Sequence, residues 1–136
     1  MMRRRVFAAI SALTLGWLAP AEPADADERL AQQREAFASA YREVRAGRED
    51  TVARYRGELS DYVLYPYLEY ESLRRHFHRQ EVRDIEAFLN REQGTLLEAR
   101  LRTAWLRHLS RRGDWAHYVR AYRPQGSSEL ACRLLA

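Results

Sequence analysis

The stretch at residues 59–70, L-S-D-Y-V-L-Y-P-Y-L-E-Y, decides the fold expected for this chain. Half of the eight tyrosines of the chain surround its proline, and they are Tyr62, Tyr65, Tyr67 and Tyr70. Pro66 is tolerated in the first turn of a helix, where a backbone N–H has no partner within the helix. Each tyrosine adds a large apolar ring with a polar tip. The segment therefore predicts a packed junction between helices; a sugar-stacking surface is the less favoured interpretation.

The flanking sequence repeats apolar residues three and four apart, with no alternating run long enough for a strand, so an all-α fold is expected. Asp27 is predicted to cap a first helix that Gly47 ends, and Asp50 to cap a second. A third opens at the Tyr/Pro motif, and a fourth follows. The expected inner faces are Leu30, Phe37, Tyr41, Val44, Val52, Tyr55, Leu59, Leu68, Leu73, Phe77, Val82, Ile85 and Leu89.

A helical hairpin is predicted next. Thr95 and Glu98 form a capping box, in which hydroxyl and carboxylate each satisfy a free N–H at the helix start. Gly113 can end this helix in the left-handed conformation, and Asp114 can cap the following one. Ser128 can start a last helix. The expected inner faces are Leu97, Leu101, Trp105 and Leu109, then Trp115, Tyr118, Val119 and Tyr122, then Leu130, Leu134 and Leu135.

Successive hairpins with apolar faces on both sides predict an α-solenoid, a superhelical array in which each pair of helices buries its surface on the next. A compact helical bundle is the alternative. Because the chain stops at Ala136 inside the last apolar pattern, without a closing residue, we expect the array to be truncated at its C-terminus. About 110 residues can form one small domain or part of one.

Residues 1–26 have the features of a secretory signal peptide. A basic start to Arg5 precedes an apolar run at residues 6–18, which is too short to span a bilayer comfortably. We expect cleavage after Ala26 rather than after Ala21, and no stable membrane insertion of the remainder; a short N-terminal anchor is the alternative. Cys132 is the only cysteine, so we expect it to be a buried apolar residue or to pair outside this chain.

The net charge of the chain excludes few classes of binding partner. Without residues 1–26 the chain keeps 20 arginines and 17 acidic residues, a net charge of +3, and it contains no lysine. Export and the interleaved acids argue against nucleic acid as a partner. A mildly positive surface is compatible with an anionic partner such as the peptide carboxylates of cell wall.

No catalytic, metal or cofactor site is predicted. His76 and His78 lie two residues apart, which would turn them to nearly opposite sides of a helix. His108 and His117 flank the Gly113 turn without a set of ligands at metal-binding spacing. No nucleophile elbow, phosphate loop or Cys/His signature is present in the sequence.

Three segments carry a family resemblance that covers essentially all of residues 27–136. They are residues 61–70, D-Y-V-L-Y-P-Y-L-E-Y, residues 106–115, which end R-R-G-D-W, and residues 127–132, S-S-E-L-A-C. Together they resemble the N-terminal superhelical region of soluble lytic murein transglycosylases, although Val63 stands where that family often has proline. The residues that match the family's scaffold motifs are Tyr62, Tyr65, Pro66, Tyr67, Leu68, Glu69, Tyr70, Gly113, Asp114 and Trp115.

The resemblance implies a periplasmic scaffold for a lysozyme-like domain that cleaves peptidoglycan between N-acetylmuramic acid and N-acetylglucosamine, leaving 1,6-anhydro ends. The family's catalytic Glu-Ser pair occurs here only as Glu71-Ser72, within the scaffold region. Its Gly-Leu-Met-Gln element cannot occur, because the only methionines are Met1 and Met2. We therefore expect an N-terminal scaffold fragment that is inactive alone. The alternative is a free-standing periplasmic helical-repeat protein that binds a protein or peptidoglycan.

Overall fold

The protein is all-helical in the computed structural model, which describes residues 23–124 and 126–135. These residues form seven helices and no strand, as expected from the sequence. The predicted signal peptide lies outside the described residues except for its last four. The helices are α1 (Pro23–Arg45), α2 (Thr51–Leu59), α3 (Tyr65–Arg75), α4 (Val82–Arg91), α5 (Leu96–Arg112), α6 (Trp115–Ala121) and α7 (Ser128–Leu134).

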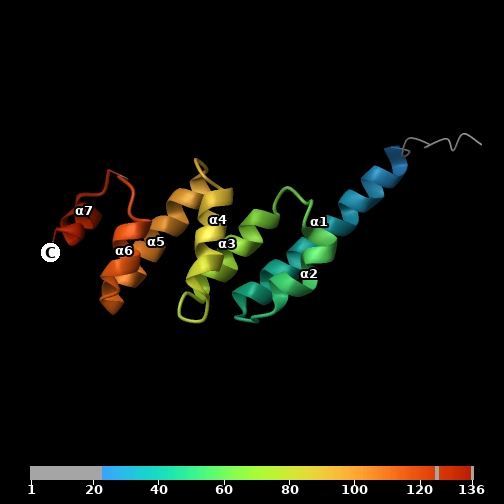
Figure 1. Cartoon of the computed structure of the whole chain (residues 1–136). Coiled ribbons are helices and arrows are strands. Elements are labelled where there is room, and N and C mark those ends of the chain that lie inside the picture. The colour runs from blue at the N-terminus through green and yellow to red at the C-terminus, as the bar shows by residue number, and fades with distance from the viewer. Residues whose placement is uncertain (1–22, 125, 136) are drawn as a thin grey trace, which may run out of the picture.

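The helices follow one another along an elongated array, with α1 at one end and α7 at the other (Figure 1). Helix α1 packs on α2 and α3, whereas α5 packs on α3, α4, α6 and α7. Two separate apolar cores result. The first contains Ala36, Ala40, Val44, Leu59, Tyr62, Tyr65 and Leu68. The second contains Phe77, Ile85, Phe88, Leu89, Leu97, Leu101, Trp105, Leu106, Leu109, Tyr118, Ala121 and Leu130.

The Tyr/Pro motif forms the junction of α1, α2 and α3. Pro66 lies in the first turn of α3, where its missing N–H costs nothing. Tyr62 and Tyr65 are buried, and the Tyr62 ring lies 5.6 Å from the ring of Phe37. Tyr67 faces solvent and Tyr70 is half-buried against the second core. The predicted helix junction is therefore present, and α3 connects the two cores.

The predicted hairpin between α5 and α6 is also present. The Thr95 hydroxyl accepts a hydrogen bond from the Glu98 N–H at 3.2 Å, so half of the capping box forms. The Glu98 carboxylate instead bonds Arg102. Gly113 has φ of 69°, the left-handed conformation that a residue with a Cβ rarely adopts. The Asp114 carboxylate then caps α6 by accepting from the His117 N–H at 3.3 Å.

Several expected helix boundaries were wrong. Helix α1 begins at Pro23, so Asp27 lies within it, because a first-turn proline followed by alanine favours helix. Asp50 precedes α2 but makes no side-chain cap, since its ψ of 9° is not the extended conformation from which a capping side chain reaches back. Phe77 lies beyond the end of α3 at Arg75, yet it remains buried.

Some residues expected on inner faces are exposed. Trp115 is 46% exposed and Val119 is 61% exposed, because the buried stripe of the short helix α6 runs through Tyr118 and Ala121 instead. Leu135 follows the end of α7 and is exposed. Cys132, expected to be buried, is exposed because a residue two positions from the buried Leu130 points to another side of the helix.

Candidate functional site

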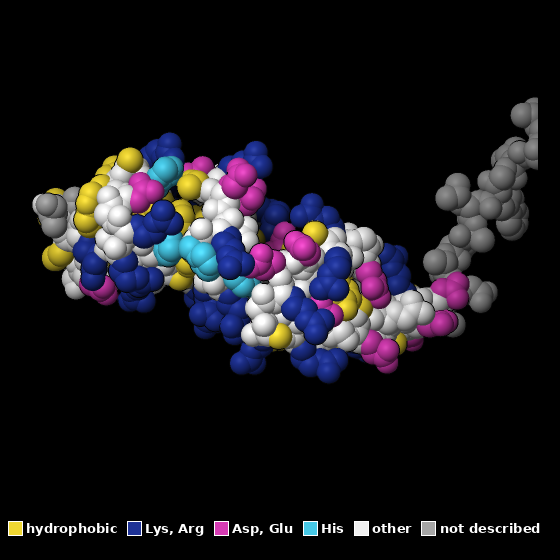
Figure 2. All heavy atoms as spheres, turned by 90° about the horizontal axis from the view of Figure 1, so that it is seen from below, with side chains coloured by type: hydrophobic (Ala, Val, Ile, Leu, Met, Phe, Trp, Pro, Cys, Tyr) yellow, Lys and Arg dark blue, Asp and Glu magenta, His cyan; other side chains and the backbone are white. Residues whose placement is uncertain are grey.

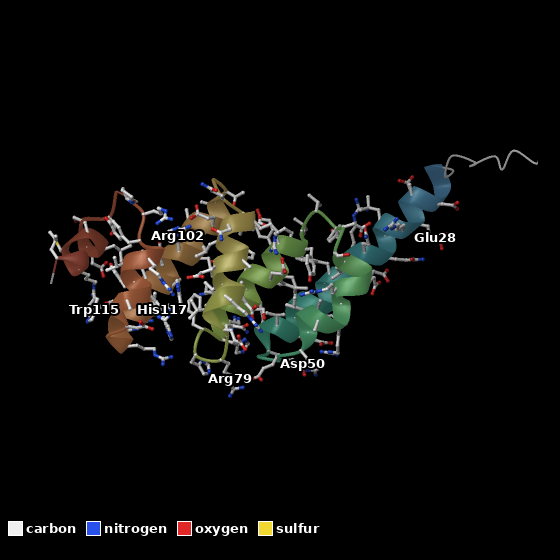
Figure 3. The ribbon with its side chains drawn as sticks, in the orientation of Figure 1. Glu28, Asp50, Arg79, Arg102, Trp115 and His117 are labelled. Carbon is white, nitrogen blue, oxygen red and sulfur yellow. The ribbon has the colours of Figure 1, made fainter. Side chains whose placement is uncertain are left out.

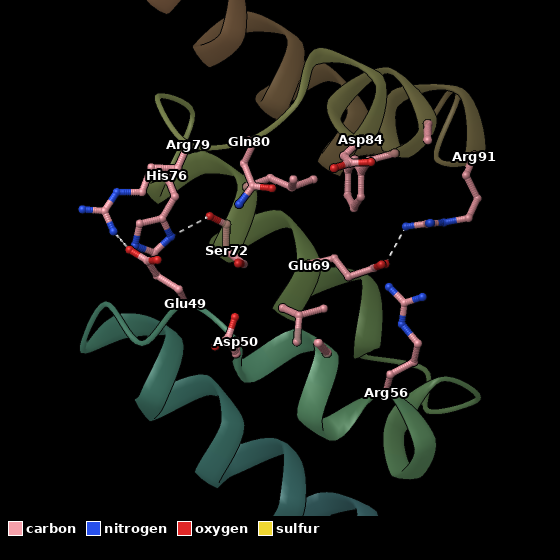
Figure 4. Close-up of a pocket in the computed structure, with 15 residues that line it drawn as sticks. Glu49, Asp50, Arg56, Glu69, Ser72, His76, Arg79, Gln80, Asp84 and Arg91 are labelled. Carbon is pink, nitrogen blue, oxygen red and sulfur yellow. Dashed lines mark hydrogen bonds and ion pairs between the residues drawn. The ribbon is translucent and has the colours of Figure 1, made fainter.

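A groove of about 450 Å³ between α2, α3 and α4 is the main candidate site (Figure 4). Both charged and apolar side chains line it, and Figure 4 shows Glu49 with Arg79 at one end and Glu69 with Arg91 at the other. The apolar residues are Val52, Ala53, Leu73, Ala87 and Phe88. Such a mixture of apolar and charged side chains suits a small polar ligand or a segment of chain.

One end of the groove is closed by an ion pair between Glu49 and Arg79. Glu49 precedes α2, and Arg79 lies in the turn between α3 and α4, so the pair joins two elements that are 30 residues apart in sequence. Arg79 and Asp50 lie along the same edge of the array (Figure 3). Both partners are about half exposed, at 58% for Arg79 and 49% for Glu49, so the pair contributes at most about 1 kcal/mol.

The other end contains Glu69, Arg91 and Arg56, of which Glu69 belongs to the Tyr/Pro motif. The Arg91 Nη2 donates to the Glu69 Oε2 at 2.5 Å and joins α4 to α3. The Arg91 guanidinium also lies over the Phe88 ring, 5.2 Å from its centroid. In Figure 4 the Arg56 side chain reaches toward Glu69 from α2. Glu69 therefore lies among cationic groups from both neighbouring helices.

The electrostatics of this end follow from burial. Burial raises the pKa of the Glu69 carboxyl above its ordinary range, and the positive charges of Arg91 and Arg56 oppose that shift. Burial also raises the pKa of the Tyr65 hydroxyl, with the charge of Glu69 adding to the effect and Arg56 opposing it. That hydroxyl is buried and has no hydrogen-bond partner among the described residues, so Arg56 acts on it through its charge.

Glu69 has one property of a glycosidic general acid, a raised pKa, but its environment does not suit proton donation. A general acid must offer its proton to a leaving oxygen, and most glycosidases place a second carboxyl group at a set distance from it. The Glu69 oxygen instead accepts a hydrogen bond from Arg91. This arrangement joins α3 to α4 by the Glu69–Arg91 ion pair, while the positive charge of Arg56 on α2 acts on Glu69 from the other side.

Glu71, the first residue of the sequence's only Glu-Ser pair, does not line this groove. It is 6% exposed and lies on α3. Its carboxylate accepts hydrogen bonds from Arg75 at 2.7 Å and from Arg74 at 3.2 Å. A buried carboxylate held by two arginines on its own helix stabilises the helix.

The histidines are grouped more closely than the sequence predicted. His76 and His78 do not point to opposite sides of a helix, because both follow the end of α3, and their rings lie 6.5 Å apart. Histidine side chains form a band on the face shown in Figure 2. His108 stacks on Trp105, with ring centroids 5.3 Å apart. In the described part of the chain, no three potential ligands are placed to hold a metal ion.

The Gly113-Asp114-Trp115 segment is also structural in its contacts. The His117 Nδ1 lies 2.8 Å from both carboxylate oxygens of Asp114, and this interaction lowers the pKa of Asp114. Trp115 packs edge-on against Tyr118, with ring centroids 5.7 Å apart. Figure 3 shows Trp115 and His117 together on α6. The motif thus turns the chain between α5 and α6.

The groove itself was not predicted from the sequence. Glu49, Arg56, Arg79 and Arg91 were not singled out, because each pairs or faces across elements and no fixed spacing marks such contacts. The only available signal was the Glu69 position within the Tyr/Pro motif. Among the helices described, none combines the length and apolar character that crossing a bilayer requires.

Comparisons with known proteins identify no relative. No family model, no curated protein and no solved structure matches the chain.

Proposed function

We propose that the chain is an N-terminal part of the helical scaffold of a lytic murein transglycosylase, the family that its motifs resemble. In this proposal its helices stack as an α-solenoid, it lies in the periplasm after removal of residues 1–26, and it contributes no catalytic group. Peptidoglycan is its partner through the complete enzyme. The class of protein is therefore a structural scaffold within a glycan-cleaving enzyme.

The burial of three residues of the Tyr/Pro motif is the observation that carries the proposal. Tyr62, Tyr65 and Leu68 are each at most 8% exposed and fill the first core. Gly113 and Asp114 set the turn that begins α6. The residues that carry the resemblance thus include those that a helical scaffold needs, rather than residues that converge on a reaction centre.

The two-core arrangement supports the solenoid part of the proposal. A compact bundle gathers its helices around one core, whereas a stacked array buries each pair of helices against its neighbours. Here the first core belongs to α1, α2 and α3, and the second to the segments from Phe77 onward. The cross-helix ion pairs Glu49–Arg79 and Glu69–Arg91 lie where the two regions meet.

The coding sequence beyond the Ala136 codon tests the proposal. We expect an open reading frame that continues through further helical hairpins into a lysozyme-like domain with the family's Glu-Ser pair and Gly-Leu-Met-Gln element. A stop codon there, with no such domain encoded nearby, would contradict the proposal and favour a free-standing helical-repeat protein that binds a protein or peptidoglycan.

A further inference from the structure

Positive charge is concentrated in the C-terminal part of the array. Residues 96–135 contain eight arginines and only three acidic residues, an excess of five positive charges. Residues 27–95 contain 12 arginines and 14 acidic residues, an excess of two negative charges. Because the helices follow one another along an elongated array, this difference in sequence is also a separation in space (Figure 1). The region of α5, α6 and α7 therefore attracts anions.

A second groove, of about 400 Å³, lies between α3 and α5, so that one of its walls belongs to this basic region. Three arginines and no acidic residue line it. Its lining residues are Tyr70, Arg74, Ala99, Arg100, Thr103, Ala104 and Arg107. The small side chains on α5 leave a shallow floor, and the half-buried Tyr70 ring stands beside the arginines.

The arginines of α5 form a row along one face of the helix. Arg100, Arg107 and Arg111 are seven and four residues apart, which returns them to nearly the same side of the helix. At a rise of 1.5 Å per residue, they are spaced about 10 Å and about 6 Å along the axis. All three are exposed. Such a row matches a linear partner that carries repeated negative charges.

The ion pairs that these arginines form within the chain leave most of their positive charge available to a ligand. No ion pair with a described residue involves Arg100 or Arg111. Arg107 lies 3.4 Å from Glu129, and both are 49% exposed, so this contact is weak. Arg74 shares Glu71 with Arg75. An arginine fork with free donors binds a carboxylate through two parallel hydrogen bonds.

We propose that this arginine groove binds a carboxylate-bearing glycan strand, namely peptidoglycan through the acidic groups of its peptides. The inference rests on the proposed function for the choice of glycan. Arg100 and Arg107 in the groove, and Arg111 one turn further along α5, pair with successive carboxylates, and the Tyr70 ring offers an apolar surface to a sugar ring. The shallow floor at Thr103 and Ala104 admits an extended polymer.

Co-sedimentation of the purified chain with insoluble peptidoglycan tests the groove. The test variant is Arg100→Gln/Arg107→Gln/Arg111→Gln. The matched control, Arg34→Gln/Arg42→Gln/Arg45→Gln, removes the same charge from exposed positions of α1 over the same 11-residue span. We expect the test variant to bind about tenfold more weakly, as when three exposed charge contacts are lost together, and the control to bind within about twofold of the parent. Binding should also weaken with added salt.

Chemical amidation of the peptidoglycan carboxylates separates the sources of binding. Amidation should weaken binding of the parent chain by about the same factor by which the three substitutions weaken binding to untreated peptidoglycan. Equal sedimentation of parent and test variant would overturn the groove while leaving the proposed function standing. Binding to polyglutamate but not to peptidoglycan would overturn the glycan assignment and count against the proposed function. No sedimentation of the parent with either polymer would overturn the groove alone, since the coding sequence judges the proposed function separately.

Discussion

His108 is the residue whose environment departs most from an ordinary surface histidine. Its ring packs against Trp105 and Phe77, with ring centroids 5.3 Å and 5.4 Å away. Its Nε2 is buried and has no hydrogen-bond partner among the described residues. Burial lowers the pKa of His108, and the positive charges of Arg112, Arg111 and His78 lower it further. The folded protein therefore favours the neutral ring.

Acidification should destabilise the fold through this residue. Because the pKa of His108 is lower when folded than its ordinary value of about 6.5, the unfolded state binds the proton more readily, and the free energy of unfolding falls as pH drops below about 6.5. Urea denaturation at a series of pH values between about 7.5 and 5 measures this.

His108→Phe keeps the ring stacking but removes the titrating group. As pH falls, the free energy of unfolding of the parent should therefore decrease relative to that of this variant. A difference that stays constant over this range would show that the environment of His108 does not disfavour its proton.

At the residue scale, the sequence correctly predicted the burial of the tyrosines that pack at the helix junction. Tyr62 and Tyr65 were expected at a helix junction and are buried there. Trp115 and Cys132 were expected to be buried and are exposed. In a short helix, the packing against the neighbouring helix determines which face is buried. Apolar character alone does not determine which face of a seven-residue helix turns inward.

At the scale of elements, the turn between α5 and α6 depends on backbone conformation. The Gly113 N–H bonds the Ser110 carbonyl at 3.2 Å, and the Asp114 N–H bonds the Leu109 carbonyl at 3.0 Å, which satisfies the end of α5. A Cβ at Gly113 would meet only the Trp115 ring nitrogen, at 4.0 Å. The cost of a side chain there is therefore conformational rather than steric.

Gly113→Ala should lower the free energy of unfolding by about 1 kcal/mol, since L-residues other than Gly avoid positive φ. Gly57→Ala provides the matched control: Gly57 lies inside α2 with no heavy atom within 4 Å of an added Cβ. That change should raise the free energy of unfolding by roughly 0.5–1 kcal/mol, because alanine favours helix. Urea denaturation of both variants compares them directly, and equal effects of the same sign would contradict this interpretation of Gly113.

The existence of elements was predictable, and their ends less so. Gly47, with φ of 82°, follows α1, and Thr95 and Asp114 cap helices through their side chains. These residues act locally, so the sequence shows them. The predicted start of α1 at Asp27 and the predicted Asp50 cap were wrong, because both depend on backbone conformations that a single residue type does not fix.

At the scale of the whole molecule, two cores along one array imply that stability is not uniform. The first core depends on Leu59 and the second on Leu106, both with no exposed surface. In a stacked array each region is stabilised by itself and by its neighbour, so damage stays largely local. In a single compact bundle damage spreads over all helices.

Leu59→Ala and Leu106→Ala should each lower the free energy of unfolding of their own region by about 2–5 kcal/mol, because burial is lost and a cavity is left behind. Hydrogen exchange measured by mass spectrometry should then show faster exchange mainly in α1, α2 and α3 for Leu59→Ala. For Leu106→Ala the increase should lie mainly in α5, α6 and α7. The same increase over all helices in both variants would argue for one cooperative bundle.

The grooves belong to this scale, and the sequence did not reveal them. Glu49 meets Arg79 and Glu69 meets Arg91 across the chain, and Arg74 lies on the same groove as Arg100 although 26 residues separate them. Periodicity predicts which faces turn inward, but pairings between elements depend on how helices cross. The excess of arginine in residues 96–135 was visible in the sequence, whereas the groove that uses it required the structure.

In the proposed function this chain is a scaffold that does not itself cleave glycan. Digestion of purified peptidoglycan with the purified chain, followed by chromatography of the soluble products, tests it most directly. We predict no release of 1,6-anhydro products, because Glu71 is held by Arg74 and Arg75 and Glu69 by Arg91. Release of such products by the parent chain, with loss of activity in Glu71→Gln or in Glu69→Gln, would contradict the claim.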